Sequence, residues 1–340
     1  MTGYERYIRM IKKQPVDIVP RTPILMQYAA EFIGSDYAAF ASDYKVLVEA
    51  NIRCAETFGI DQVSSISDPY RETHGFGSEI TYVKNGTPRS THPLASQKDL
   101  SLLKKPDPYK SERMFDRIKA ISRYKELTKD NYSILGWVEG PAAEAADLRD
   151  TSNFLFDLID DPAFTVELME HCLKTGIEFA LAQIDSGADT IGIGDAIASQ
   201  VSPQIYEELI QPCEKKLVKA IKNAGAFVKL HICGDINHLL PGISDLGVDI
   251  LDVDHMNDLR KVRTAMGSGV VLTGNIDPAA GVLYGTPDAI YQKVLQCYKE
   301  AGNPYFVNAG CEIPSGTPEQ NLKALCNPVS LSLSSDHKTV

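Results

Sequence analysis

The sequence lacks any long hydrophobic run. No segment approaches the roughly 18 consecutive apolar residues that a membrane-spanning helix requires. The opening stretch MTGYERYIRMIKKQ also lacks the apolar core of a signal peptide. A membrane protein and a secreted protein are therefore not expected, and we expect the protein to be cytoplasmic.

Basic residues are fewer than acidic ones. The chain carries 34 Lys and Arg against 45 Asp and Glu, a formal net charge of -11. Because nucleic acids and anionic membranes are repelled by such an average surface, neither is expected as the main partner.

Cysteine is too sparse and too irregularly spaced for a disulfide framework. The seven cysteines are residues 54, 172, 213, 233, 297, 311 and 326. An odd number cannot all pair within one chain, so we expect reduced thiols.

Short apolar runs rich in branched residues alternate with longer segments of helical period, which predicts parallel strands joined by helices. The eight runs are residues 22–27, 61–67, 132–138, 188–195, 227–233, 248–254, 269–275 and 305–310. Eight such units predict an α/β fold of the TIM (β/α)8 barrel type, with an open doubly wound sheet as the alternative. We expect residues 1–326 to form a single catalytic domain and the polar, serine-rich residues 327–340 a disordered tail.

A β-hairpin is expected as an insertion after the second strand. The segment EITYVKNGTPRSTH, residues 79–92, alternates apolar and polar residues around an Asn85-Gly86 turn. Such an insertion often covers a barrel mouth.

Reactive side chains stand at most of the predicted strand ends, where the active site of a TIM barrel lies. They are Asp68, Asp195, His231, Cys233, Asp254, Asn275 and Cys311. His231 and Cys233 are separated by one residue, so both side chains leave the strand on the same face. Together with Cys311 they form a donor set that suits zinc in tetrahedral geometry with one position open. A hydrogen-bonded structural histidine and small apolar cysteines are the alternative interpretation.

Three motifs then invite comparison with a known family. LHICGD (230–235), GNIDP (274–278) and NAGCEIPSGTPEQNLKA (308–324) resemble the methylcobamide:coenzyme M methyltransferases, within the uroporphyrinogen decarboxylase superfamily. The resemblance covers most of the chain and implies a TIM barrel. It also implies that His231, Cys233 and Cys311 bind a catalytic zinc ion. An acidic fourth ligand is expected from Asp254, with Asp252, taken as solvent-facing, as its competitor.

The resemblance implies methyl transfer between a methylcobamide, presented by a corrinoid carrier protein, and a small thiol such as coenzyme M. Tetrahydrofolate is an alternative acceptor, and demethylation of methoxy or methylamine compounds towards the corrinoid is the reverse case. Asp68, Asp195 and Asn275 are expected to orient the thiol or the corrinoid, or else to make loop and helix-cap hydrogen bonds. A sulfonate-binding arginine would point to coenzyme M, and Arg71 and Arg149 are the candidates.

Decarboxylases of the same superfamily are the metal-free alternative. They carry an arginine-bearing segment after the first strand and a histidine near the last one, where this chain has LMQYAAEF (25–32) and Cys311. These differences disfavour a highly anionic porphyrinogen as substrate. A corrinoid-handling scaffold without turnover is the remaining alternative, although the paired C-x-x-C units usual in closed structural zinc sites are absent.

Overall fold

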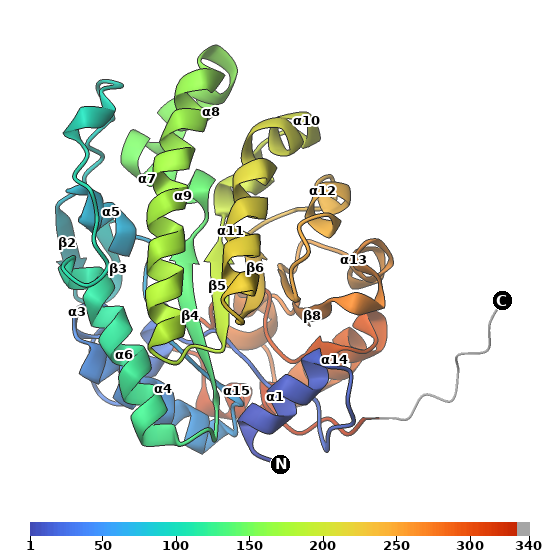
Figure 1. Ribbon diagram of the computed structural model, residues 1–340. Helices are drawn as coiled ribbons and strands as arrows, with labels where there is room; N and C mark the ends of the chain where they lie inside the picture. The colour runs from blue at the N-terminus through green and yellow to red at the C-terminus, as the bar shows by residue number, and fades with distance from the viewer. Residues whose placement is uncertain (332–340) are drawn as a thin grey trace.

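A curled sheet of parallel strands forms the centre of the protein in the computed structural model, which describes residues 1–331 (Figure 1). The strand order is β1-β4-β5-β6-β7-β8-β9, and every neighbouring pair is parallel. The strands are β1 (Gln62–Ser64), β4 (Ser133–Glu139), β5 (Thr190–Gly194), β6 (Phe227–Ile232), β7 (Ile250–Val253), β8 (Val271–Gly274) and β9 (Tyr305–Phe306). This is a TIM-like α/β fold, which confirms the predicted fold class.

Helices surround the outer face of the sheet (Figure 1). The α-helices are α1 (Gly3–Ile11), α2 (Gln27–Phe32), α3 (Tyr37–Ser42), α4 (Tyr44–Phe58), α5 (Arg71–Phe76), α6 (Glu112–Thr128), α7 (Pro141–Arg149), α8 (Thr151–Asp160), α9 (Pro162–Asp185), α10 (Pro203–Ile205), α11 (Gln211–Asn223), α12 (Leu240–Ser244), α13 (Leu259–Met266), α14 (Pro287–Ala301) and α15 (Glu319–Leu325). Short 3-10 or π segments are η1 (Leu100–Leu102), η2 (Ala196–Gln200), η3 (Tyr206–Ile210), η4 (Gly267–Gly269) and η5 (Pro278–Leu283). Each helix among residues 1–331 is too short or too polar to span a bilayer.

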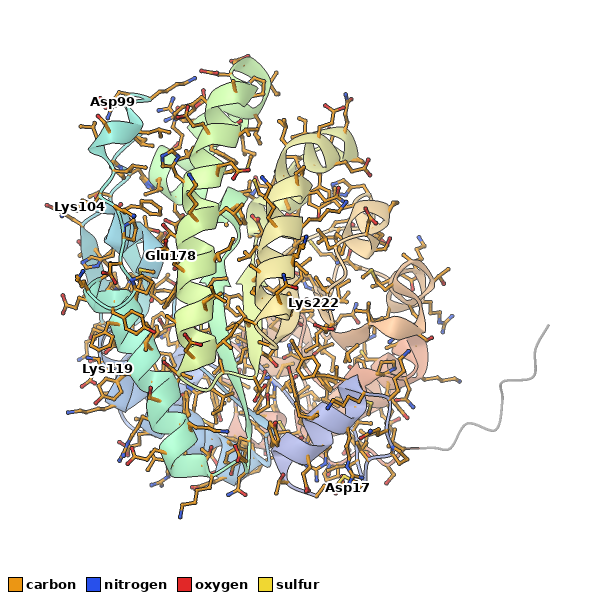
Figure 2. All side chains as sticks on the ribbon, in the orientation of Figure 1. Asp17, Asp99, Lys104, Lys119, Glu178 and Lys222 are labelled. Carbon is orange, nitrogen blue, oxygen red and sulfur yellow. The ribbon has the colours of Figure 1, made fainter. Side chains whose placement is uncertain are left out.

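The longer helices are amphipathic, and this holds them on the sheet. In α11, Leu217, Val218 and Ile221 recur at helical spacing and are buried, whereas Lys222 lies on the outer surface (Figure 2). Such a helix buries one apolar stripe against the sheet and leaves its charged face in water.

The first predicted strand, residues 22–27, is not formed as a strand. Arg21 makes an isolated parallel bridge to Val307, and its carbonyl accepts a hydrogen bond from the Asp61 N–H at 2.9 Å. This segment therefore joins the β9 side of the sheet to the β1 side and closes the ring. Pro20 and Pro23 have no N–H to donate, which prevents a regular ladder here.

Helix α1 closes the end of the barrel at which the strands begin. Tyr7 stacks on Phe306 with ring centroids 4.7 Å apart, and its hydroxyl lies 3.1 Å from Thr190 Oγ1. Tyr7 and Phe306 also share a buried apolar cluster with Ile250 and Val271. The opposite end, at the carboxyl ends of the strands, is left for a functional site.

Strands β2 (Ile80–Val83) and β3 (Gly86–Ser90) pair antiparallel in a separate two-stranded sheet. This hairpin follows α5 and packs against α3, where the Tyr37 N–H donates to the Lys84 carbonyl at 2.9 Å. Figure 1 shows it at the side of the barrel.

The end of the described chain is part of the fold. Val329 is buried, and its carbonyl accepts a hydrogen bond from the Val19 N–H at 2.9 Å. Ser330 forms an antiparallel bridge with Ile18. Residues 327–331 of the predicted tail therefore pack against the barrel, and the rest of that prediction, residues 332–340, lies outside the described part of the chain.

Candidate metal centre

His231, Cys233 and Cys311 come together at the carboxyl ends of the strands. The His231 Nε2 atom lies 3.0 Å from Cys233 Sγ and 3.7 Å from Cys311 Sγ, and the two sulfur atoms are 3.9 Å apart. Cys311 follows β9 in a segment tied to β8, because the Gly310 N–H donates to the Ile276 carbonyl at 2.8 Å. Residues 80 positions apart in the sequence thus present three donor atoms to one point.

The geometry of these atoms fits a zinc ion. Zn–N and Zn–S bonds of roughly 2.0–2.3 Å at tetrahedral angles place neighbouring ligand atoms about 3.6–3.8 Å apart. Two of the three separations, 3.7 and 3.9 Å, agree with that spacing, and the His231–Cys233 contact is shorter. One imidazole and two sulfur ligands leave a fourth tetrahedral position, which is the composition of catalytic zinc sites.

One of the two thiols ionises readily in this arrangement. Hydrogen bonding from Cys233, and then from His231, holds the pKa of the Cys311 thiol well below its usual value of 9.0. The same contact, together with burial, raises the pKa of Cys233. The thiolate that binds a metal is therefore favoured at Cys311, whereas the protonated thiol is favoured at Cys233.

Asp252 lies against the Nδ1 side of the His231 ring. Its Oδ2 atom lies 3.3 Å from His231 Nδ1 and 2.9 Å from Lys229 Nζ, and its Oδ1 atom accepts from Asn308 Nδ2 at 3.1 Å. Asp252 is fully buried, so the expectation that it faces solvent is wrong. Burial acts to raise its pKa, but Lys229 and then His231 lower it, so the carboxylate is ionised. A carboxylate on Nδ1 leaves Nε2 directed at the two sulfur atoms.

Asp254, the expected fourth ligand, is engaged elsewhere. Its Oδ2 atom accepts from the Gly234 N–H at 2.9 Å, and its Oδ1 atom lies 2.7 Å from His255 Nδ1. Among the described residues, the group of ligand atoms within 4.8 Å of one another consists of His231, Cys233 and Cys311 without Asp254. Asp254 instead shapes the turn that follows Cys233.

The three residues expected to orient a substrate make hydrogen bonds within the protein. Asp68 is buried and binds Arg113 at 2.7 Å and Arg71 at 3.4 Å. Asp195 accepts from two N–H groups at the start of α7, those of Ala142 and Ala143, and burial raises its pKa to about 7.

Asn275 completes this set, with its Nδ2 atom 2.6 Å from the Asn257 carbonyl. For Asp68, Asp195 and Asn275 the loop and helix-cap interpretation therefore accounts for the contacts seen. Neither candidate arginine is free, because Arg71 pairs with Asp68 and Glu139 and Arg149 pairs with Asp157 at 2.7 Å.

Sequence reasoning missed Glu139 and Trp137 on the inner face of β4. Trp137 Nε1 donates to Glu139 Oε1 at 2.9 Å, and the indole and His231 ring centroids are 6.4 Å apart. The indole occupies space above Gly192, where an added Cβ would lie 2.2 Å from its ring. The signal in the sequence was a large residue, Trp137, that lies opposite glycines of the neighbouring strand. Recognising it requires the pairing register of the two strands, which the sequence alone does not give.

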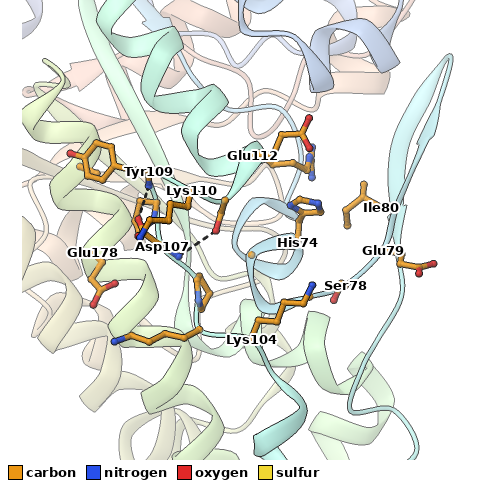
Figure 3. Close-up of a pocket in the computed structure, with 18 of the residues that line it drawn as sticks. His74, Ser78, Glu79, Ile80, Lys104, Asp107, Tyr109, Lys110, Glu112 and Glu178 are labelled. Carbon is orange, nitrogen blue, oxygen red and sulfur yellow. Dashed lines mark hydrogen bonds and ion pairs between the residues drawn. The ribbon is translucent and has the colours of Figure 1, made fainter.

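A wide groove lies away from this cluster, on the outer wall (Figure 3). It measures about 1430 Å³ and is bordered by the end of α5, the 104–111 segment and α9. Lys104, Lys110, Asp107 and Glu178 belong to its lining, and Lys110 pairs with Asp107 at 2.8 Å. Charges of both signs meet there, and His231, Cys233 and Cys311 take no part in it.

The fold and the site together define a class of protein. It is a TIM-like barrel with one imidazole and two thiols at the carboxyl ends of its strands. The sequence profile described as Uroporphyrinogen decarboxylase (URO-D) matches residues 2–330. The chain belongs to this family.

Individual relatives agree with that assignment. The uroporphyrinogen decarboxylase of Prochlorococcus marinus is 28% identical over 284 residues, covering 81% of this chain and 79% of the relative. That of Crocosphaera subtropica is 26% identical and covers 95% of each chain. Among solved structures, a methyltransferase from Methanosarcina mazei superposes with a TM-score of 0.87 at 24% identity, covering 96% of this chain and 97% of the other. At that identity the structural match supports the fold.

Proposed function

We propose that the protein is a zinc-dependent corrinoid methyltransferase. It would move a methyl group between a methylcobamide, held by a corrinoid carrier protein, and a small thiol such as coenzyme M or another acceptor. The observation that carries this proposal is the convergence of His231 Nε2, Cys233 Sγ and Cys311 Sγ at the open end of the barrel. A corrinoid is too large for an enclosed pocket, so the carrier protein would present it at this end.

The protein's own residues would prepare the site. Cys233 and Cys311 supply negative charge that offsets a divalent ion, and Asp252 holds the His231 ring so that Nε2 faces the ion. When bound, zinc lowers the pKa of a substrate thiol and holds its sulfur as a thiolate. Trp137 and the walls of the barrel exclude water around it.

The transfer itself is a nucleophilic displacement. The thiolate sulfur attacks the methyl carbon in line with the cobalt–carbon bond, a sulfur–carbon bond forms, and the cobalt–carbon bond breaks with its electron pair on cobalt. Cobalt(III) thereby becomes cobalt(I), and the proton of the original thiol is released to solvent. Binding both partners at one barrel mouth supplies the orientation that a displacement requires.

Metal-free decarboxylation is the second candidate, because several relatives at 26–28% identity are named uroporphyrinogen decarboxylase. The charges at the mouth argue against it. The loops that follow β5 to β9 contain neither Lys nor Arg, so a highly anionic porphyrinogen would find no cation on that side.

Metal analysis combined with a methyl-transfer assay tests the proposal. We expect about one zinc per chain in the purified protein, and loss of the methylcobalamin spectrum when thiols or tetrahydrofolate are added. Cys311→Ser should lose zinc and turnover together, while Cys54→Ala, a buried cysteine far from the cluster in α4, should retain both. Zinc-free protein that decarboxylates uroporphyrinogen would reverse the conclusion, and zinc-loaded protein that turns over no acceptor would favour a scaffold.

A further inference from the structure

The barrel mouth is acidic on the side of the metal cluster. Five loops follow β5, β6, β7, β8 and β9, and they span residues 195–202, 233–239, 254–258, 275–286 and 307–318. None of them contains Lys or Arg. Their acidic residues are Asp195, Asp235, Asp254, Asp258, Asp277 and Glu312.

Buried cations in the described chain are already paired. Every buried Arg or Lys among residues 1–331 has an acidic partner: Arg6 with Asp17 and Asp61, Arg21 with Asp61, Arg71 with Asp68 and Glu139, Arg113 with Asp68, Arg117 with Asp116, Arg149 with Asp157, and Lys229 with Asp252. An anionic group on a substrate at this site would have to compete with these carboxylates for a cation. Breaking a buried pair leaves an uncompensated charge, so a sulfonate or carboxylate is a poor fit.

Glu139 is the acidic group placed to meet a substrate. It is the last residue of β4, and its neighbour across the sheet is Gly194, which in turn neighbours His231. Glu139 and His231 are thus separated by two strand spacings, roughly 10 Å between Cα atoms. The strand between them has no side chain at that level, because residue 194 is glycine.

One oxygen of Glu139 is held and the other is available. Oε1 accepts from Trp137 Nε1 at 2.9 Å and lies 3.4 Å from an Arg71 nitrogen. Oε2 makes no hydrogen bond within the described protein, yet it is not among the buried polar atoms that lack a partner. It therefore keeps some exposed surface although the residue as a whole is buried. An added Cβ on Gly194 would lie 3.3 Å from Oε2, so the glycine keeps this approach open.

We infer that the methyl acceptor is a thiol that bears a cationic amine, with its sulfur at the His231–Cys233–Cys311 cluster and its ammonium group at Glu139 Oε2. This inference rests on the proposed function and, among its small-thiol acceptors, favours an aminothiol over coenzyme M, whose sulfonate is anionic. Burial raises the pKa of Glu139 well above its usual value, and an ammonium group at Oε2 favours the ionised carboxylate. The proton released by Glu139 on binding passes to solvent.

Three thiols of matched size separate the possibilities. They are 2-aminoethanethiol, 2-mercaptoethanol and 2-mercaptoethanesulfonate, which end in a cationic, a neutral and an anionic group. Calorimetric titration into the zinc-loaded protein should give a dissociation constant for the aminothiol at least tenfold lower than that for the sulfonate. In Glu139→Gln the association constant of the aminothiol, divided by that of the neutral thiol, should fall towards one. Glu178→Gln, on the outer wall at α9, should keep the wild-type ratio (Figure 3).

Binding decides this inference, and turnover decides the proposed function. Equal or tighter binding of the sulfonate, no binding of any thiol, or an unchanged ratio in Glu139→Gln would overturn the assignment of an aminothiol. Selective aminothiol binding without methyl transfer from methylcobalamin would uphold the assignment and count against the methyltransferase.

Discussion

Asp252 Oδ2 lies between two partners, 3.3 Å from His231 Nδ1 and 2.9 Å from Lys229 Nζ. The carboxylate thus connects the His231–Cys233–Cys311 cluster to a lysine buried in the middle of the barrel. This arrangement follows from the sheet, because His231 on β6 is in register with Asp252 on β7. Orientation of the histidine and stability of the barrel therefore depend on the same group.

Asp252→Asn should weaken zinc binding by about 10–100-fold, because the amide holds the His231 ring less firmly and does not increase its basicity. Competition with a chromophoric chelator measures the change. Asp245→Asn, which alters an exposed aspartate paired with Lys215, is the matched control and should bind zinc as the wild type does. Equal affinities in the two variants would show that Asp252 does not orient the ligand.

Lys229→Met should lower the free energy of unfolding by about 3–5 kcal/mol, because it leaves the buried Asp252 charge with one partner fewer. Adding Asp252→Asn to this variant should recover part of the loss, since the unpaired charge is then removed. Urea denaturation measures both changes. Lys222→Met, which alters a lysine on the outer surface, should have little effect. A double variant no more stable than Lys229→Met would argue against charge as the cause.

Gly192→Ala should lower the free energy of unfolding by about 1–3 kcal/mol, because its Cβ would lie 2.2 Å from the Trp137 ring and the indole must shift. The shifted indole also presses on the neighbouring His231, so zinc affinity should fall as well. Thermal and urea unfolding, with zinc titration, measure these effects. Gly269→Ala is the control, since an added Cβ there meets no atom within 4 Å. A tolerated Gly192→Ala would mean that Trp137 has room to move.

Protonation of Asp68 should make the protein less stable in acid. Arg113 and then Arg71 hold its pKa below the ordinary value of 3.8, against the effect of burial. A depressed pKa stabilises the fold fully above the ordinary value, and this contribution is lost as the pH falls below it. Asp68→Asn should therefore be about 3–5 kcal/mol less stable at pH 7, and the difference should shrink as the pH falls below about 4. Unfolding curves across this range measure it, and a difference independent of pH would exclude ionisation as the cause.

Periodicity along the chain was sufficient to predict the barrel. Runs such as FVKLHIC and VDILDVD correspond to β6 and β7, because buried parallel strands are apolar on both faces. The first run failed because Pro20 and Pro23 limit its hydrogen bonding, which the pattern of apolar residues does not register.

The sequence predicted only part of the candidate site. The H-x-C spacing places His231 and Cys233 on one face, and the family resemblance added Cys311. Asp252 was misjudged because an aspartate in a strand is usually solvated, and its burial depends on Lys229, a charge from another strand. Glu139 was missed because its relation to His231 exists only through the register of three strands.

Trp137 is the sole tryptophan of the chain, and its ring lies 6.4 Å from that of His231. The protein therefore carries a native fluorophore at its candidate site. Emission excited at the indole band would report the arrival of a metal ion or of a ligand at Glu139 without any attached label. Stopped-flow mixing could then resolve the order in which the two bind.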